Sequence, residues 1–158
     1  MPMDQTRSEI SIKPVQNEGE LLQALAIREV VFIEEQHVPE GIDRDAEDAR
    51  AYHVLAMHAG HAIGTGRLVL LSEPPKGQSG GPWGQIGRMA VLQAHRKDGV
   101  GSRLLTALEE EARRRGVERI TLHAQLYTLE FYRKYGYQPV GPVFEEAGIP
   151  HIEMHKAL

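Results

Sequence analysis

The stretch Gln85-Ile-Gly-Arg-Met-Ala-Val-Leu-Gln-Ala-His-Arg-Lys-Asp-Gly-Val-Gly-Ser-Arg-Leu-Leu105 runs from an apolar segment through a glycine loop into a helical pattern. Residues 86–92 are rich in β-formers and lead into a polar run, which predicts a buried strand. From Val100 to Ala112 apolar residues recur at spacings of three and four, and Gly116 follows where a left-handed residue would end a helix. The sequence therefore predicts a strand, a loop and an amphipathic helix in succession.

The loop between this strand and helix is a candidate anion-binding site. Glycines let the backbone approach a ligand closely, and a helix N-terminus offers unpaired N–H groups with a partial positive charge, so a phosphate is a natural ligand. The alternative is that Gly99 and Gly101 only permit a tight turn. A dinucleotide fingerprint would need a third glycine at Leu104, and the Gly-Lys-Ser/Thr of a Walker loop does not occur. The candidate loop residues are Arg96, Lys97, Asp98, Gly99, Val100, Gly101 and Ser102.

Length and composition predict one globular domain over residues 1–158. No apolar run is long enough to span a membrane, and residues 1–20 carry charges where a signal peptide would be apolar, so we expect a cytoplasmic protein. The absence of cysteine excludes disulfides, thiolate metal sites and a cysteine nucleophile. The net charge of −4 argues against general nucleic-acid binding.

Alternation, capping and turn residues predict the other elements. Asn17 and Glu20 have the spacing of a capping box, so a helix should begin there and run to about Glu35. Residues 36–50 are acidic and turn-prone, which indicates a loop or a short helix. In the long helix, Glu109–Glu111 precede Arg113–Arg115 by four residues, which favours ion pairs along it. The predicted strands are 8–15, 52–57, 62–71, 119–124, 138–144 and 151–156, with a short helix at 126–135 and a proline- and glycine-rich connection at 72–83.

Several of these segments together resemble one known family. Arg96-x-x-Gly99-x-Gly101, after the strand Met89-Ala-Val91 and before an amphipathic helix, resembles the acetyl-CoA signature of the GNAT superfamily of N-acetyltransferases. Gln125 and Glu130-Phe-Tyr-Arg-Lys-Tyr-Gly-Tyr137 resemble its second signature. Two further stretches, Arg28-x-x-Val31-Phe32-x-x-Glu35-Gln36 and Glu146-Ala-Gly-Ile-Pro-His151, are similar to the ElaA/YjcF-like branch. The resemblance implies an α+β fold, with a GNAT-like mixed, mostly antiparallel twisted sheet of six to seven strands flanked by about four helices in α/β/α layers.

The resemblance also implies a site with acetyl-CoA as co-substrate and no metal. A backbone N–H of Met89, Ala90 or Val91 would meet the developing oxyanion, and Tyr132 would protonate the departing thiolate. Tyr132 has a plain alternative as an amphipathic core residue. Gln125 would bond the cofactor's amide or simply satisfy a strand end.

Three residues are candidates for the general base, namely Glu35, Glu146 and His151, and each has a structural or solvent-exposed alternative. His151, Glu153 and His155 share one face of the last predicted strand, but His151 and His155 would be ~13 Å apart at ~3.3 Å per residue, too far for one metal ion. The acidic segments 35–48 and 145–151 would attract a cationic amine, so we expect the acceptor there.

These observations predict an N-acetyltransferase that acts on a primary amine of a small molecule or a peptide. Direct transfer in a ternary complex is favoured, because no cysteine exists to carry the acetyl group. The alternatives are a non-catalytic acyl-CoA-binding sensor or scaffold module and, against the acidic balance, a nucleic-acid-associated modifier. A homodimer remains open.

Overall fold

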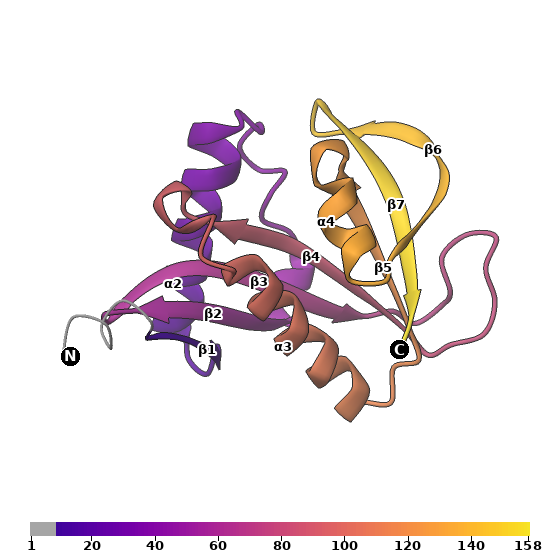
Figure 1. The fold of residues 1–158 in the computed structure, drawn as a ribbon, viewed down its shortest axis with the longest axis horizontal. Coiled ribbons are helices and arrows are strands. Elements are labelled where there is room, and N and C mark those ends of the chain that lie inside the picture. The colour runs from indigo at the N-terminus through magenta and orange to yellow at the C-terminus, as the bar shows by residue number, and fades with distance from the viewer. Residues whose placement is uncertain (1–8) are drawn as a thin grey trace. The chain divides into compact units, whose positions relative to one another are not determined.

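The computed structural model describes residues 9–158, and its ribbon is drawn in Figure 1. Seven strands form one sheet in the order β1-β2-β3-β4-β5-β7-β6. The pairs β1–β2, β5–β7 and β6–β7 are antiparallel and β4–β5 is parallel, so the predicted mixed, mostly antiparallel GNAT-like sheet is confirmed. The strands are β1 Ile10–Pro14, β2 Tyr52–His58, β3 His61–Leu70, β4 Trp83–Val91, β5 Arg119–Gln125, β6 Gln138–Glu146 and β7 Ile149–Ala157.

The α-helices follow β1, β4 and β5, which is the predicted order of elements. Within residues 9–158 there are three α-helices, α2 Glu18–Arg28, α3 Val100–Arg114 and α4 Leu129–Lys134. The shorter helical segments are the π-helix η1 Glu29–Glu35 and the 3₁₀ segments η2 Ala46–Ala49, η3 Gln93–His95 and η4 Leu126–Thr128. No helix among the described residues has the length and apolar character to cross a membrane.

The chain divides into two compact units, which are described separately below. The first unit contains the described residues up to Arg67 together with Arg88–Leu108, and the second contains Leu68–Gly87 and Glu109–Leu158. The dividing points fall inside β3, near the middle of β4 and inside α3 rather than in linkers. A single domain over residues 1–158 stays a prediction.

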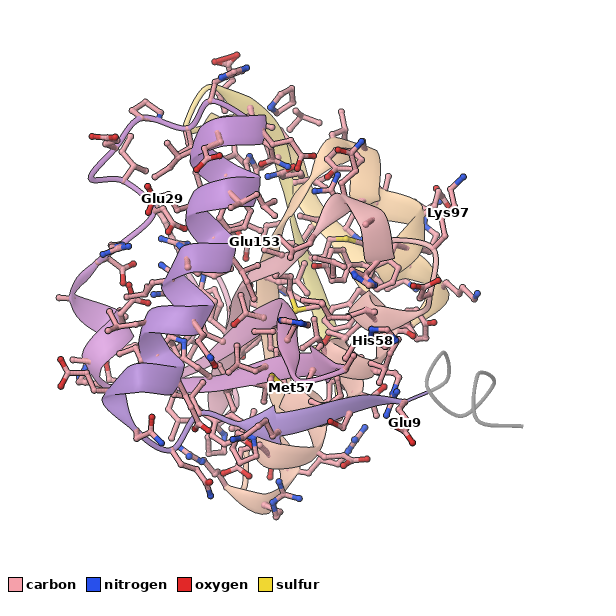
Figure 2. The ribbon with its side chains drawn as sticks, turned by 90° about the vertical axis from the view of Figure 1, so that its left-hand side faces the viewer. Glu9, Glu29, Met57, His58, Lys97 and Glu153 are labelled. Carbon is pink, nitrogen blue, oxygen red and sulfur yellow. The ribbon has the colours of Figure 1, made fainter. Side chains whose placement is uncertain are left out.

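In the first unit, the predicted helix after Asn17 changes its hydrogen bonding partway along. The Asn17 side chain accepts from the Glu20 N–H at 2.8 Å, while the Glu20 carboxylate accepts from the Gln16 N–H, one residue before the predicted cap. The α-helical part ends at Arg28 and η1 continues it as a π-helix, so the two look like one rod, with Glu29 labelled at the junction (Figure 2). The wider π-turns bring Val31 and Phe32 into the core.

Helix α3 packs unusually close to β3 in the first unit. A Cβ on Gly66 would lie 2.7 Å from the Met89 sulfur and 2.9 Å from a Leu108 methyl group. A Cβ on Gly64 would lie 3.1 Å from Leu104. Glycine in these two strand positions therefore lets the helix approach the sheet, which fixes the depth at which the N-terminal part of α3 lies.

In the second unit, α3 ends where it was predicted to end, but the side chain of Glu109 does not pair along the helix as predicted. Gly116 has φ +79° and donates to the Arg113 carbonyl, while Val117 donates to the Ala112 carbonyl, which closes the helix. Glu111 pairs with Arg114 and Arg115. The predicted ion pair of Glu109 along the helix is wrong, because Glu109 faces the interior of the unit and accepts hydrogen bonds from the Tyr137 hydroxyl and from Lys156.

Candidate functional site

The loop between β4 and α3 combines a left-handed glycine with an open helix end. Gly99 has φ +75° and immediately precedes α3, whereas Gly101 already lies in the first helical turn. Arg103 is the residue whose N–H reaches the Gly99 carbonyl. By helix geometry the N–H groups of residues 100–102 have no partner four residues back, so they are oriented out of the helix end. Lys97, labelled in Figure 2, is exposed in this loop.

Arg96 is fixed beside this helix end by two sets of contacts. Its Nε donates to the Val91 carbonyl at 2.8 Å, and its two terminal nitrogens donate to the Glu35 carboxylate at 2.5 and 2.6 Å. The hydrogen bonds from Arg96 lower the pKa of Glu35. The contact thus joins the motif at residues 28–36 to the loop that begins at Arg96. It argues against Glu35 as a general base, because a carboxylate with a lowered pKa is a poor proton acceptor.

The strand that should carry the oxyanion donor contains a backbone feature that the sequence did not reveal. Arg88, immediately before Met89, has φ +52° in the middle of β4. A residue with a Cβ rarely adopts this left-handed conformation, and no glycine marks the position. Ala90 is buried, and Leu92 beyond it donates to the Ile63 carbonyl at 2.9 Å.

Three arginines neutralise the acidic loop that was expected to attract a cationic acceptor. Arg28 is 1% exposed and binds both Asp43 and Asp48, at 3.0 and 2.8 Å. Arg67 binds Asp45 and Asp48 at 2.7 and 2.8 Å. Burial acts to raise the pKa of Asp48, but the hydrogen bonds and charge of Arg28 outweigh it, so the pKa of Asp48 lies well below its usual range. These residues form the Arg/Asp network, whose members are Arg28, Arg67, Arg88, Asp43, Asp45 and Asp48.

Local sequence patterns do not reveal the Arg/Asp network, because each of its members is an ordinary residue in its own segment. The only available signal was the run Asp43-Arg-Asp-Ala-Glu-Asp48 followed by isolated arginines in two predicted strands. The partners are up to 45 residues apart along the chain, so local patterns did not indicate their pairing.

In the second unit, Tyr132 and Gln125 occupy different surroundings. Tyr132 is 8% exposed, and its ring meets those of Phe131 and Tyr137 edge-on at centroid distances of 5.0 and 5.8 Å. Burial raises the pKa of Tyr132, and its hydroxyl makes no hydrogen bond to another residue in 9–158. Gln125 ends β5 opposite His151 of β7, and its carbonyl accepts from the Thr128 hydroxyl at 2.6 Å.

His151 lies in a cluster with one carboxylate and two aromatic rings. It is 6% exposed, and its Nδ1 is 2.7 Å from the Ile149 carbonyl, so Nδ1 carries a proton and donates it. This leaves Nε2 as the nitrogen that can take up a proton, with the Glu146 carboxylate 3.8 Å away. Glu146 also bonds His123 at 2.9 Å, and Phe144 stacks on His151 at 5.9 Å.

An apolar hollow of about 360 Å³ adjoins this cluster, lined by Leu126, Tyr127, Ile149 and Pro150. Tyr127 is 77% exposed. On β7, Glu153, labelled in Figure 2, pairs with His155. In the part of the chain that the structure describes, no group of side chains is suited to holding a metal ion.

The predicted site residues therefore divide between the two units. The first unit holds the loop, Glu35 and the strand residues Met89, Ala90 and Val91, and it brings Glu35 and Arg96 together. The second unit holds Gln125, Tyr132 and the His151 cluster.

Comparison with known proteins finds one family. The family described as "Acetyltransferase (GNAT) domain" matches residues 14–158. The "Uncharacterized N-acetyltransferase YjcF" of Bacillus subtilis (strain 168) is 34% identical over 141 residues, which covers 89% of this chain and 94% of that protein. The "Protein ElaA" of Escherichia coli (strain K12) is 30% identical over 157 residues, covering 98% and 95%.

Solved structures show the same fold. The crystal structure of Escherichia coli ElaA has a TM-score of 0.78 at 27% identity and covers 93% of this chain and 99% of its own. An aminoglycoside 6'-N-acetyltransferase complexed with coenzyme A has a TM-score of 0.66 at 21% identity, covering 93% and 96%, a likeness of fold alone.

Proposed function

Because the chain belongs to the GNAT acetyltransferase family, whose members transfer acyl groups from acyl-CoA, we propose that it is an N-acetyltransferase using acetyl-CoA. The acceptor is the primary amine of a small molecule or a peptide. The observation that carries the proposal is the helix end at Val100, which combines the left-handed Gly99, outward N–H groups and the held guanidinium of Arg96.

The pyrophosphate of the coenzyme binds at this helix end. The N–H groups of residues 100–102 and the positive end of the helix dipole attract the phosphate oxygens. Glu35 acts here as a positioning residue, since it holds the Arg96 fork in one orientation beside the helix. A structural neighbour of the same fold was solved in complex with coenzyme A, which supports the proposal that this chain binds the coenzyme.

Transfer then needs a donor for the oxyanion, a base and an acid. The acceptor nitrogen attacks the thioester carbon, and a backbone N–H in Met89–Val91 stabilises the resulting oxyanion. His151 takes a proton from the amine through Nε2. The oxyanion then re-forms the C=O bond as the C–S bond breaks, and Tyr132 gives its proton to the departing thiolate.

The environment of Tyr132 suits this task. Burial raises the pKa of its phenol, so the group is fully protonated near neutral pH. A thiolate that departs into similarly poor solvent also binds its proton more tightly than in water, which keeps the transfer favourable. No cysteine is available to carry the acetyl group, so transfer is direct in a ternary complex.

On the acceptor side, the apolar hollow beside His151 favours an amine attached to an apolar group. Leu126 and Tyr127 bury such a group, while the Glu146 carboxylate attracts the ammonium form of the amine before it loses its proton.

The test measures free CoA released from acetyl-CoA in the presence of a panel of primary amines that differ in apolar size, together with the binding of CoA by calorimetry. We expect tight CoA binding and turnover with at least one amine carrying an apolar group. Binding of CoA without turnover on any amine would favour the sensor or scaffold alternative. Failure to bind CoA or acetyl-CoA would refute the proposal.

A further inference from the structure

We propose that the Arg/Asp network holds Arg88 in its left-handed conformation and thereby aims the backbone N–H that follows it at the thioester oxygen. Arg88 is then a positioning residue that acts through the main chain of Met89 and not through its own charge. This inference rests on the proposed function, because it assigns the origin of the oxyanion donor in that reaction.

The conformation of Arg88 stands apart from the other left-handed residues with side chains. In the described chain these are His37, Ala59 and Ala147, and all three lie in loops or turns between elements. Of the four described non-glycine residues with positive φ, Arg88 is the one that lies inside a strand. A left-handed residue in a strand rotates the next peptide group, so the N–H of Met89 no longer follows the regular alternation of β4.

The contacts of Arg88 explain how an unfavourable conformation is held. Its Nε donates to the Asp43 carbonyl at 2.9 Å and a terminal nitrogen donates to Asp45 at 3.2 Å. Asp43 is itself 5% exposed and bound by the buried Arg28. Moving the side chain away from these acceptors would lose a hydrogen bond to a carbonyl and an ion pair, although Asp43 and Asp45 would keep Arg28 and Arg67 as partners.

Arg67 provides an internal comparison. It reaches Asp45 and Asp48 of the same network from β3 with contacts of 2.7 and 2.8 Å, and it does so from ordinary strand backbone. Joining the network from the sheet therefore does not require a left-handed residue. The conformation of Arg88 serves the backbone beyond it, and strain of this kind is typical of functional positions.

Replacing Arg88 with glycine or with alanine separates a role in positioning the backbone from a role in stability. Both substitutions remove the side chain from the network, but only glycine adopts φ near +52° freely. Glycine also relieves backbone strain at this φ, so thermal unfolding favours Arg88→Gly over Arg88→Ala under either role. A role in stability alone predicts that the carbonyl band of bound acetyl-CoA is the same in both folded variants and in the wild type. A role in positioning predicts that Arg88→Ala loses the band shift and that Arg88→Gly restores it.

The experiment records the infrared carbonyl band of acetyl-CoA labelled with ¹³C at the thioester carbon, bound to each variant, together with CoA affinity, thermal unfolding and kcat. We expect a band shifted to lower wavenumber in the wild type, lost in Arg88→Ala and largely regained in Arg88→Gly, with CoA affinity unchanged within about twofold. The loss of one oxyanion donor predicts a fall in kcat on the order of 10²–10³-fold for Arg88→Ala and a smaller fall for Arg88→Gly.

Matched substitutions at Arg67 are the control. Arg67→Gly should be no better than Arg67→Ala in any readout, because that position has ordinary backbone. If Arg88→Ala does not fold, Arg88→Gln replaces it in the comparison. Equal bands and rates for the glycine and alanine variants at position 88 would overturn the inference. A wild type that binds no acetyl-CoA would instead refute the proposed function, and a wild type that binds it with an unshifted band would refute this inference alone.

Discussion

Replacing Tyr132 with phenylalanine removes one hydroxyl group and separates a catalytic role from a packing role. The edge-on contacts of its ring with Phe131 and Tyr137 are retained by phenylalanine. The hydroxyl makes no hydrogen bond to another residue in 9–158, so none is lost within this part of the chain. The free energy of unfolding should therefore change by less than about 1 kcal/mol.

The expected effect on catalysis is much larger. Positioned proton transfer contributes about 10²–10⁴-fold, which corresponds to about 2.7–5.5 kcal/mol of activation free energy. Burial raises the pKa of Tyr132, so the wild-type phenol stays protonated across the physiological range. The fall in kcat caused by Tyr132→Phe should thus be nearly constant between about pH 6 and pH 9.

Tyr137→Phe is the matched control, because the neighbouring ring loses a hydroxyl that is hydrogen-bonded. The Tyr137 hydroxyl donates to Glu109 at 2.7 Å, and Glu109 is 6% exposed. Losing a hydrogen bond to a charged, buried group costs about 1.5–3 kcal/mol, or a fall in Tm of roughly 3–12 °C for a chain of this size. Turnover should scarcely change. Tyr135→Phe, at the end of α4, should alter neither quantity.

The assay compares kcat from CoA release at saturating amine with thermal unfolding for the three variants. Chemistry must first be shown to limit turnover, for example by single-turnover kinetics. If Tyr132→Phe then retains full turnover, or if it loses stability as Tyr137→Phe does while turnover is intact, the acid is solvent or another residue.

Three further predictions concern the loop, the base and the acidic segment. Gly101→Val places a branched side chain where the phosphates approach, so CoA affinity measured by calorimetry should fall by about tenfold or more; unchanged affinity in a folded variant would exclude this placement. His151→Gln should lower kcat/KM for the amine by about 10²-fold while CoA affinity stays constant; an unchanged kcat/KM in a folded variant would exclude His151 as the base. Asp48→Asn should cost about 3 kcal/mol of unfolding free energy near neutral pH, because it disrupts the ion pairs with Arg28 and Arg67. The pKa of Asp48 is lowered in the folded state, so this stabilisation is complete above the unfolded pKa of about 3.9 and is lost as pH falls towards the folded value. Denaturant unfolding at several pH values should show the difference in unfolding free energy between variant and wild type closing below about pH 4. A difference that is constant with pH would contradict the role of the Asp48 ion pairs.

The sequence predicted most elements because their signals are local. Gly116 at the end of α3 and Asn17 at the start of α2 act within one helical turn, and both were found where predicted. The expected likeness to the ElaA/YjcF-like branch is confirmed by relatives of those names. The sheet topology was predicted from the resemblance of the sequence motifs to one family, because no local pattern in the sequence indicates which strands pair.

What the sequence did not predict depends on partners far along the chain. The π-helical continuation at 29–35 and the inward side chain of Glu109 reflect packing against other elements. Glu35 was a candidate base until its partner Arg96, 61 residues away, was known. The left-handed Arg88 has only the preceding Gly87 as a local signal, and the side chain of Arg88 contacts Asp43 and Asp45 in a distant loop.

Gly64 and Gly66 of β3, which have no side chains, also determine how strongly an anion is attracted to the N-terminal end of α3. A Cβ on Gly64 would press on side-chain ends of Leu104 and Val100, and a Cβ on Gly66 on those of Met89 and Leu108, so α3 would rise wherever these side chains did not move aside. A lifted helix would carry its terminal dipoles away from the loop that Arg96 borders, and the attraction between separated charges weakens with distance. The size of two residues in the sheet thus sets the electrostatic field at a phosphate that neither residue touches.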